Sequence, residues 1–348
     1  MEGITTVGVD LAKSVFQVHA VNAAGAVIVK RALRRKDFAA FMAKLPWCLV
    51  GMEACASSHH WARELTKLGH DVRLIPPAYV KAYVRRQKND AADAAAICEA
   101  VSRPSMRFVP IKSEEQQAVL MLHRARALLT AQRTALINAL RGHLAEFGMV
   151  APRGPRSLGA LLDVVKDEAD ESLPATARLA LAPLARRLAA LEAEIDDLDR
   201  HLLEWHRGNE TSQRLATIPG VGPITATALA ATITDPGMFK SGRELAAFLG
   251  LVPRQSSSGG KERLGRISKM GDRYLRSLLI VGATAVLRHA KVGGSSSRVW
   301  AEGLLTKKPF KLVAAALANK TARIAWAVMV RGEVFRKTEG SEVRATAA

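Results

Sequence analysis

Four acidic residues have the type and setting of a metal site that acts on phosphate esters. Asp10 interrupts the apolar run VGVDLA, and Glu53 ends a second apolar run, VGMEA. A carboxylate in a core strand is costly unless a partner or a metal neutralises it. Asp90 and Asp93 are three residues apart, so on a helix they project from one face. Taken singly, each acid also fits a salt bridge or a solvated face. Together they predict an oxygen-only site for Mg²⁺ or Mn²⁺, where two ions about 4 Å apart would clamp a phosphodiester.

A second candidate lies in the segment 253–271, where Ser256, Ser257 and Ser258 precede two glycines. Glycines expose a hydroxyl and let the backbone approach a phosphate, and a serine there could attack phosphorus if a metal or base activates it. Basic side chains around the serines could hold phosphate oxygens; they are Arg254, Lys261, Arg263, Arg266, Lys269, Arg273 and Arg276. The residues alone favour the simpler alternative, a flexible loop that binds phosphates without chemistry.

The sequence PGVGP within residues 215–233 predicts a helix-hairpin-helix. Gly220 and Gly222 would permit a tight turn whose free amides meet a backbone phosphate at a helix N-terminus. Such a contact positions DNA without reading its bases. A purely structural turn explains the pattern equally well.

The acids must be positioned by residues 1–105, whose pattern predicts an α/β domain with a mixed sheet. Three β-rich runs with turns between them, over residues 4–33, predict an antiparallel meander. Two further strands are expected at 48–54 and 70–77. Helices are expected at 37–45, 58–69 and 78–102. The resulting order, β-β-β-α-β-α-β-α, places helices on the faces of the sheet.

Residues 106–210 have the pattern of long helices. Residues 113–147 form one helical pattern, and residues 148–172, with Gly, Pro and charge, are expected to be a connection. From Leu181 to Leu202, apolar residues alternate spacings of three and four, which is an a/d seam over three heptads. The seam predicts a coiled coil, formed with residues 113–147 or with a second subunit. An ordinary bundle helix is the alternative.

Residues 211–335 predict a mostly helical C-terminal domain, followed by a tail at 336–348. Beyond the PGVGP turn, helices are expected at 244–251, 272–289 and 309–329, with the basic loop 253–271 between the first two.

The net charge of the chain indicates which class of partner it binds. The chain has 348 residues and is 49% hydrophobic, so it can bury real cores. Its 51 Lys and Arg against 32 Asp and Glu give a net charge of +19, of which +14 falls in residues 211–348. A polyanion is therefore expected against the C-terminal part. Nucleic acid is favoured over a membrane surface, because the basic residues lie in Gly- and Ser-rich loops rather than along an amphipathic helix.

The remaining composition argues against a secreted or membrane protein. The three cysteines, Cys48, Cys55 and Cys98, have no metal spacing and make no disulfide scaffold. No signal peptide is visible at the N-terminus, and the apolar stretch 278–287 is too short to cross a bilayer. We expect a soluble cytoplasmic protein without a membrane partner.

The motifs VGVD, VGMEA and KNDAADA resemble the RNase H/RuvC-like domain of DEDD-type insertion-sequence transposases, the one-ten family. The segments IPGVGPITA and FLGLVPRQSSSGGKERLGRISKMGDRYLR resemble the second domain of that family. The resemblance extends over most of the chain in the family's order. It implies that Asp10, Glu53, Asp90 and Asp93 are the metal-binding set.

The resemblance further implies recombination of donor and target DNA through a 5′-phosphoserine link. Ser258, just before the glycines, matches the nucleophile best, and Ser257 is a second choice. The family also implies a homo-oligomer, a dimer or tetramer, in which one subunit's carboxylates meet another's serine. A structured noncoding RNA, called bridge RNA, would pair with both DNAs, as in other RNA-guided systems.

Two alternatives remain open on the sequence. A RuvC-like nuclease would hydrolyse branched DNA with metal-activated water and would need no serine. A non-catalytic DNA-binding protein would use the carboxylates only for structure.

Overall fold

A computed structural model describes residues 3–84, 89–152, 154, 157–289 and 296–336. The chain forms two compact units, Met1–Glu114 and Glu115–Ala348. Residues just after 105 belong to the first unit. The Val109 amide donates to the Leu74 carbonyl oxygen at 2.7 Å, and Val109 forms an isolated β-bridge with Leu74 of the strand Asp71–Ile75. The three-part division at 105 and 210 stays a prediction.

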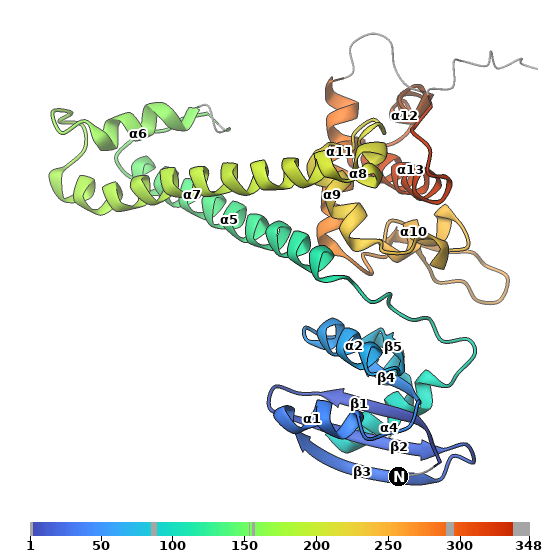
Figure 1. Ribbon diagram of the computed structural model, residues 1–348. Coiled ribbons are helices and arrows are strands. Elements are labelled where there is room, and N and C mark those ends of the chain that lie inside the picture. The colour runs from blue at the N-terminus through green and yellow to red at the C-terminus, as the bar shows by residue number, and fades with distance from the viewer. Residues whose placement is uncertain (1–2, 85–88, 153, 155–156, 290–295, 337–348) are drawn as a thin grey trace, which may run out of the picture. The chain divides into compact units, whose positions relative to one another are not determined.

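The N-terminal unit contains the predicted mixed sheet (Figure 1). Its strand order is β3-β2-β1-β4-β5, with β1–β2 and β2–β3 antiparallel and β1–β4 and β4–β5 parallel. The strands are β1 Ile4–Leu11, β2 Val15–Asn22, β3 Val27–Arg34, β4 Leu49–Glu53 and β5 Asp71–Ile75. The turn before β3 forms because the Asn22 side chain accepts bonds from two amides of that turn and Gly25 adopts a φ of +78°. The predicted α/β class is thereby confirmed for this unit.

One sheet face is covered by α1 (Arg35–Met42) and α2 (Ser58–Lys67), and the other by α4 (Asp90–Val101) (Figure 1). The core under α1 and α2 centres on Phe16, Phe38 and Trp61, whose rings pack edge to face with centroids 5.0–5.3 Å apart. Such pairs add stability beyond their buried area.

The continuous helical stretch expected at 78–102 is wrong. The structure has a short helix α3 (Pro77–Val80), a 3₁₀ turn (Lys81–Tyr83), and a separate α4. Val84 is extended, and Asn89 begins α4 as an N-cap, with extended backbone and a side chain that accepts from the Ala91 amide at 3.0 Å. A helix that starts at Asn89 places both aspartates in its first turn.

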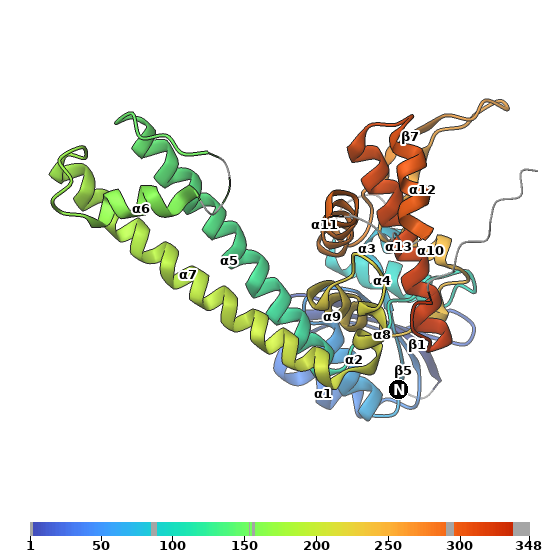
Figure 2. The ribbon, with the colours of Figure 1, turned by 90° about the horizontal axis from the view of Figure 1, so that it is seen from above.

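The C-terminal unit begins with two long antiparallel helices, α5 (Glu114–Ala145) and α7 (Ala175–Gly208) (Figure 2). Near one end Arg126 pairs with Asp199 through an Nη2–Oδ2 distance of 3.0 Å. At the other end Leu140 and Leu188 share an apolar cluster. The leucine seam of α7 is thus largely buried within one chain, and coiled-coil packing stays a prediction.

The connection expected at 148–172 contains a helix, α6 (Leu158–Lys166), so that prediction is wrong there. Leu158, Leu161 and Val165 are buried in the same cluster as Leu140 and Leu144 of α5. The Gly- and Pro-rich flanks hid this helix, because its apolar stripe spans only two turns.

The rest of the unit packs around α13 (Phe310–Arg331) (Figures 1 and 2). Its other helices are α8 Glu210–Ala216, α9 Pro223–Thr232, α10 Gly242–Phe248, α11 Arg273–His289 and α12 Ser296–Leu305, with a 3₁₀ turn at Pro236–Met238. By length and composition α13 could cross a membrane. Here Leu317, Ala318 and Ala322 of α13 are buried in the core, as in a core helix.

Candidate functional site

Asp10 and Glu53 lie at one edge of the N-terminal sheet because of strand direction. The strands β1 and β4 run parallel, with Val9 opposite Met52 in the ladder. Asp10 follows Val9 and Glu53 follows Met52, so the two carboxylates leave neighbouring strands at the same level. Both residues are partly buried.

Two glycines bring α4 onto this part of the sheet. A Cβ on Gly8 would lie 2.2 Å from the Ala94 carbonyl oxygen, and one on Gly51 would lie 2.7 Å from the Cβ of Val101. Side chains alternate along a strand, so Gly8 shares a face with Asp10, and Gly51 shares a face with Glu53. The helix therefore rests on the glycines, and its first turn meets the acids two residues further along.

The sequence reasoning missed this role of the glycines. The signal was present as a repeated pattern, glycine two residues before an acid, in VGVD and VGME. A glycine inside a strand often marks the close approach of another backbone.

The structure brings three of the four predicted acids together. One carboxylate oxygen each from Asp10, Asp90 and Asp93 lies within 4.8 Å of the others. Glu53 is not in that group, but its charge raises the pKa of Asp10, and Asp93 in turn raises the pKa of Glu53. Within the described residues, no basic side chain forms an ion pair with any of the four.

This cluster is electrostatically unfavourable without a cation. The pKa of Asp10 is raised from 3.8 to about 6; burial is the largest cause, and the charges of Asp93, Asp90 and Glu53 contribute to the same rise. Burial is also the main cause of the raised pKa of Glu53. Carboxylates that repel one another, and that have no basic partner in the described part of the chain, fit a hard divalent cation, which supplies positive charge. The donor set therefore suits Mg²⁺ or Mn²⁺.

The segment expected as a flexible basic loop is an ordered hairpin, so that expectation is wrong. Strands β6 (Pro253–Gln255) and β7 (Leu264–Ile267) pair, and the Lys261 amide donates to the Ser258 carbonyl oxygen at 3.1 Å. The two residues between them, Gly259 and Gly260, have φ of +56° and +75°. Positive φ at both central positions is the requirement of a type I′ turn, which glycines meet without strain.

The three serines are exposed near the tip of this hairpin. The Ser256 amide donates to the Arg263 carbonyl oxygen at 2.9 Å, and the Gln255 side chain donates to the Ser257 hydroxyl at 3.1 Å. Ser258 occupies the first position of the turn. Its hydroxyl has no hydrogen bond among the described residues.

The predicted phosphate-binding cations divide into two groups. Five are exposed: Lys261, Arg263, Arg266, Lys269 and Arg273. Arg254 is exposed as well, but its guanidinium also donates to the Ser268 carbonyl oxygen at 3.3 and 3.4 Å.

Arg276 corrects the sequence expectation. It is 8% exposed, and its Nη1 donates to the carbonyl oxygens of Leu249 at 3.0 Å and Met270 at 2.8 Å. The guanidinium ties the end of α10 to the segment before α11, and its donors face the protein interior. It is a structural residue in this fold rather than a phosphate contact.

The PGVGP turn joins α8 to α9. A Cβ on Gly220 would lie 2.9 Å from the Gly282 carbonyl oxygen of α11, so Gly220 is required for close packing, and its φ is +85°. Gly222 is the exposed N-cap residue of α9. Contact of this turn with DNA stays a prediction.

A buried polar network that the sequence reasoning missed lies at the start of α11. His123 of α5 lies 3.1 Å from the Tyr274 hydroxyl and 3.1 Å from the Thr227 hydroxyl of α9. Burial is the main cause that lowers the pKa of His123 to about 4, so the ring is neutral. Thr227 donates to the Pro223 carbonyl oxygen at 2.8 Å, and its oxygen is then free to accept from Nε2–H. The network fixes Tyr274, one residue after Arg273.

Comparison with known proteins covers both units. Residues 7–149 match a family model described as "Transposase", the DEDD type of IS110, and residues 212–296 match one described as "Transposase IS116/IS110/IS902 family". Asp10, Glu53, Asp90 and Asp93 lie in the first region. The PGVGP turn and the serine hairpin lie in the second.

Individual relatives are similar over nearly their whole length. The chain is 51% identical to a "Probable family 20 transposase" of Pseudomonas aeruginosa, over 96% of this chain and 99% of that protein. It is 42% identical to the "Transposase for insertion sequence element IS1328" of Yersinia enterocolitica, over 97% and 100%. It is also 42% identical to the "Transposase for insertion sequence element IS1111A" of Coxiella burnetii, over 97% and 92%.

Proposed function

Because the chain belongs to the IS116/IS110/IS902 family of transposases, we propose that it recombines the DNA of an insertion sequence with two groups of its own, an acidic cluster and a serine. The observation that carries the proposal is the convergence of Asp10, Asp90 and Asp93, whose carboxylate oxygens lie within 4.8 Å of one another. Family membership favours an enzyme over a non-catalytic DNA-binding protein.

Asp10, Asp90 and Asp93 would hold the divalent cation, Mg²⁺ or Mn²⁺, with Glu53 beside them. When bound, such a cation withdraws electron density from phosphoryl oxygens and stabilises the charge that develops on them. The α4 helix contributes by fixing Asp90 and Asp93 in its first turn. Gly8 and Gly51 contribute by letting that turn approach Asp10.

Ser258 is the proposed nucleophile, with Ser257 as the second choice. Its Oγ would form a bond to phosphorus while the bond from phosphorus to the 3′ oxygen breaks. The hydroxyl proton passes to the departing 3′ oxygen, directly or through water, which leaves a 5′-phosphoserine and a free 3′-hydroxyl. Attack by the 3′-hydroxyl of another strand would reverse these steps and release the serine.

The exposed cations of the hairpin would hold the phosphates on either side of the reacting one. Lys261 and Arg263 lie within five residues of Ser258 in the hairpin, and Arg266, Lys269 and Arg273 follow. Arginine binds phosphate oxygens bidentately, which adds orientation to charge neutralisation. Gly222, at the start of α9, would add a backbone contact to DNA.

The proposed partners are donor DNA, target DNA, a noncoding bridge RNA and further copies of the chain. The net charge of +14 over residues 211–348 supports polyanionic partners, and the resemblance in the sequence motifs supports the RNA. The α5–α7 hairpin is the proposed oligomerisation element of a dimer or tetramer. The proposed place of action is the bacterial cytoplasm, at the nucleoid.

A covalent adduct tests the serine step. The Ser258→Ala and Ser257→Ala variants would be incubated with DNA of the element, its RNA and Mg²⁺, and the products separated on a denaturing protein gel. We expect the parent and one of the two variants to give a protein–DNA adduct, and the other variant to give none. Ser277→Ala, at an exposed serine of α11, is the matched control.

A hydrolytic nuclease is the second candidate. The acidic cluster lies entirely in the N-terminal unit, and hydrolysis by a metal-activated water needs no serine. Undiminished cleavage by both serine variants, with no adduct from the parent, would establish it and overturn the serine step.

A further inference from the structure

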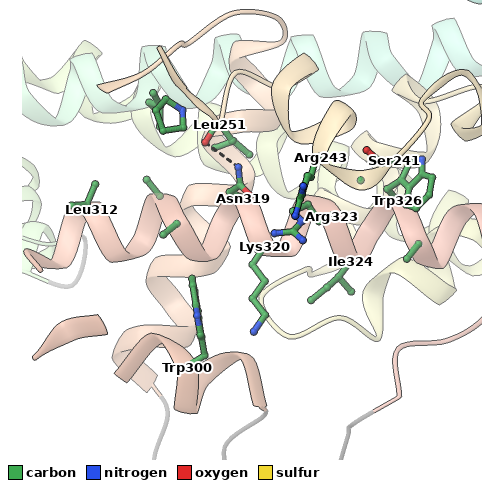
Figure 3. A pocket seen from close by; sticks show the side chains of 16 residues that line it. Ser241, Arg243, Leu251, Trp300, Leu312, Asn319, Lys320, Arg323, Ile324 and Trp326 are labelled. Atoms are coloured by element: carbon green, nitrogen blue, oxygen red, sulfur yellow. Dashed lines mark hydrogen bonds between the residues drawn. The ribbon is translucent and has the colours of Figure 1, made fainter. Parts of the chain in front are cut away.

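A cavity of about 860 Å³ lies in the C-terminal unit, along α13 (Figure 3). One wall is the side of α13 between Leu312 and Ala327. The facing walls come from the start of α10 and from the base of the serine hairpin, where Pro253 pairs with Ile267. Trp300 of α12 also lines it. The volume is in the range of pockets that hold a small organic ligand.

The walls are held by interactions that leave few polar groups for a ligand. A Cβ on Gly242 would lie 2.8 Å from the Arg323 carbonyl oxygen, so α10 rests directly on α13. The Asn319 side chain donates to the Leu251 carbonyl oxygen at 3.2 Å, and the Trp326 indole donates to that of Pro236 at 3.2 Å. These side chains form walls, and each already donates one hydrogen bond within the protein.

Three cations define the charge of the cavity. Arg243 and Arg323 are exposed, and Lys320 is partly buried with its Nζ 4.7 Å from the centre of the Trp300 ring. No acidic side chain lines the cavity, and none of the three cations forms an ion pair within the described residues. Burial and the charge of Arg323 lower the pKa of Lys320, and no counter-charge for it lies among the described residues that line the cavity. An anionic group would supply it.

The apolar surfaces suit a flat ring. Trp300 is 40% exposed, and Ala315, Ala316 and Ile324 of α13 add apolar lining to the same cavity. An exposed aromatic side chain in a cavity that is also lined by cations is an arrangement that binds unpaired nucleotides, through stacking and phosphate contacts. A duplex keeps its bases within the stack and presents only phosphates to such a pocket. Among the described residues that line the cavity, no carboxylate is available to recognise a ribose 2′-hydroxyl.

We propose that this cavity binds an unpaired nucleotide of a DNA strand, with its phosphate on Arg243 and Arg323 and its base against Trp300. The site lies at the base of the serine hairpin, so it would hold single-stranded DNA beside the segment that carries the serines. The inference rests on the DNA substrate of the family. It is independent of the serine step, and its test requires no cleavage.

Fluorescence anisotropy with the full chain tests the proposal, using a short labelled oligothymidylate, the same length of oligouridylate, and a duplex, all in EDTA. We expect the Arg243→Gln/Arg323→Gln double variant to bind oligothymidylate at least tenfold more weakly. Its slope of log affinity against log salt should fall by about 1.4, which is about 0.7 for each lost contact. Trp300→Leu should also weaken binding about tenfold and lessen the quenching of tryptophan fluorescence.

Arg331→Gln is the matched control, an exposed arginine at the end of α13 that does not line the cavity. It should bind oligothymidylate like the parent, and duplex affinity should change less than twofold in the cavity variants. Unchanged oligothymidylate binding by the double variant would overturn the proposal. The proposal would also be overturned if the double variant lost as much affinity for the duplex as for oligothymidylate. It would be overturned too if the parent bound oligouridylate more tightly than oligothymidylate. All substituted side chains are substantially exposed, and thermal melts verify folding.

Discussion

At the scale of residues, the same residue type has different roles according to its surroundings. Asp10 is half-buried among other acids, which raises its pKa to about 6. Asp199 is also partly buried, yet it pairs with Arg126. Arg273 and Arg276 are three residues apart on α11, and one is exposed whereas the other bonds to carbonyl oxygens of the interior. Residue type alone does not distinguish these cases.

The raised pKa of Asp10 predicts a pH dependence of stability in metal-free protein. Between about pH 4 and 6 the folded chain keeps a proton that the unfolded chain has lost, so the free energy of unfolding falls as pH rises through this window. The free energy of unfolding should fall by about 1–2 kcal/mol. This is less than the full linkage value, because solvent screens a half-exposed carboxylate. Urea unfolding in EDTA would measure it.

The Asp10→Asn variant lacks this titration. Its free energy of unfolding relative to the parent should rise by about 1–2 kcal/mol between pH 4 and pH 7. Asp196→Asn, at an exposed aspartate of α7, is the control. A difference between Asp10→Asn and the parent that does not vary with pH would contradict the electrostatic account.

The two arginines of α11 give a second prediction. Arg276→Gln leaves buried carbonyl oxygens without their donor, so it should lower the free energy of unfolding by about 1–3 kcal/mol. It should leave the salt slope of duplex binding unchanged. Arg273→Gln should leave stability unchanged and reduce that slope by about 0.9. Urea melts and salt titrations of binding would separate the two, and the reverse pattern would show that the roles are exchanged.

At the scale of elements, close packing and turn geometry decide where the chemistry lies. The helix α4 reaches Asp10 because Gly8 has no side chain, and the serine hairpin turns sharply because Gly259 and Gly260 accept positive φ. The helix contact and the hairpin turn each depend on glycine residues that take no part in the chemistry.

We predict that Gly8→Ala displaces α4 from the sheet. The new Cβ would meet backbone atoms of Ala94 and Cys98 at 2.2 and 2.4 Å, which cannot move without the whole helix. Overpacking of this kind costs about 1–3 kcal/mol, and the affinity for Mn²⁺, measured by titration calorimetry, should fall about tenfold or more. Gly142→Ala, at a helical glycine with open space, should keep both properties. Unchanged Mn²⁺ affinity in a folded Gly8→Ala protein would exclude this role.

The hairpin turn gives a matched pair of variants. Gly259→Asn preserves a type I′ turn, since asparagine tolerates positive φ, whereas Gly259→Val does not. We expect the first to keep adduct formation near the parent level and the second to reduce it at least tenfold, with little change in melting temperature because the tip is exposed. Equal adduct yields from both would show that turn geometry does not position the serine.

At the scale of the whole molecule, the acids and the serines belong to different compact units. Because the two groups lie on separate units, the sharing proposed from the resemblance, with the acids from one copy and the serine from another, can be tested with variants of each unit. The +14 charge of residues 211–348 places most of the excess positive charge in the second unit.

Mixing two inactive variants tests such sharing. Asp10→Asn and Ser258→Ala are each expected to be inactive alone. When the two are refolded or co-expressed together, mixed oligomers should regain adduct formation, because one copy supplies the acids and another the serine. The adduct should form only on the Asp10→Asn chain, which a size tag would identify. An adduct-free mixture with confirmed mixed oligomers would mean that each copy acts alone.

The sequence by itself determined the mixed sheet and the succession of strands and helices along the first unit, and it singled out the four acids, because strand alternation and apolar runs are local patterns. It also determined the basic character of the C-terminal part. The break before Asn89 and the helix α6 escaped prediction, because a single capping bond and two turns of apolar contact with α5 decided them.

Only the tertiary structure decided which residues meet. That three acids converge while Glu53 stands slightly apart depends on how α4 rests on Gly8 and Gly51, a contact between segments more than forty residues apart in the chain. That Arg276 turns inward depends on carbonyl oxygens supplied by α10 and by Met270. Burial and close approach are properties of packing, and no local pattern of residue types records them.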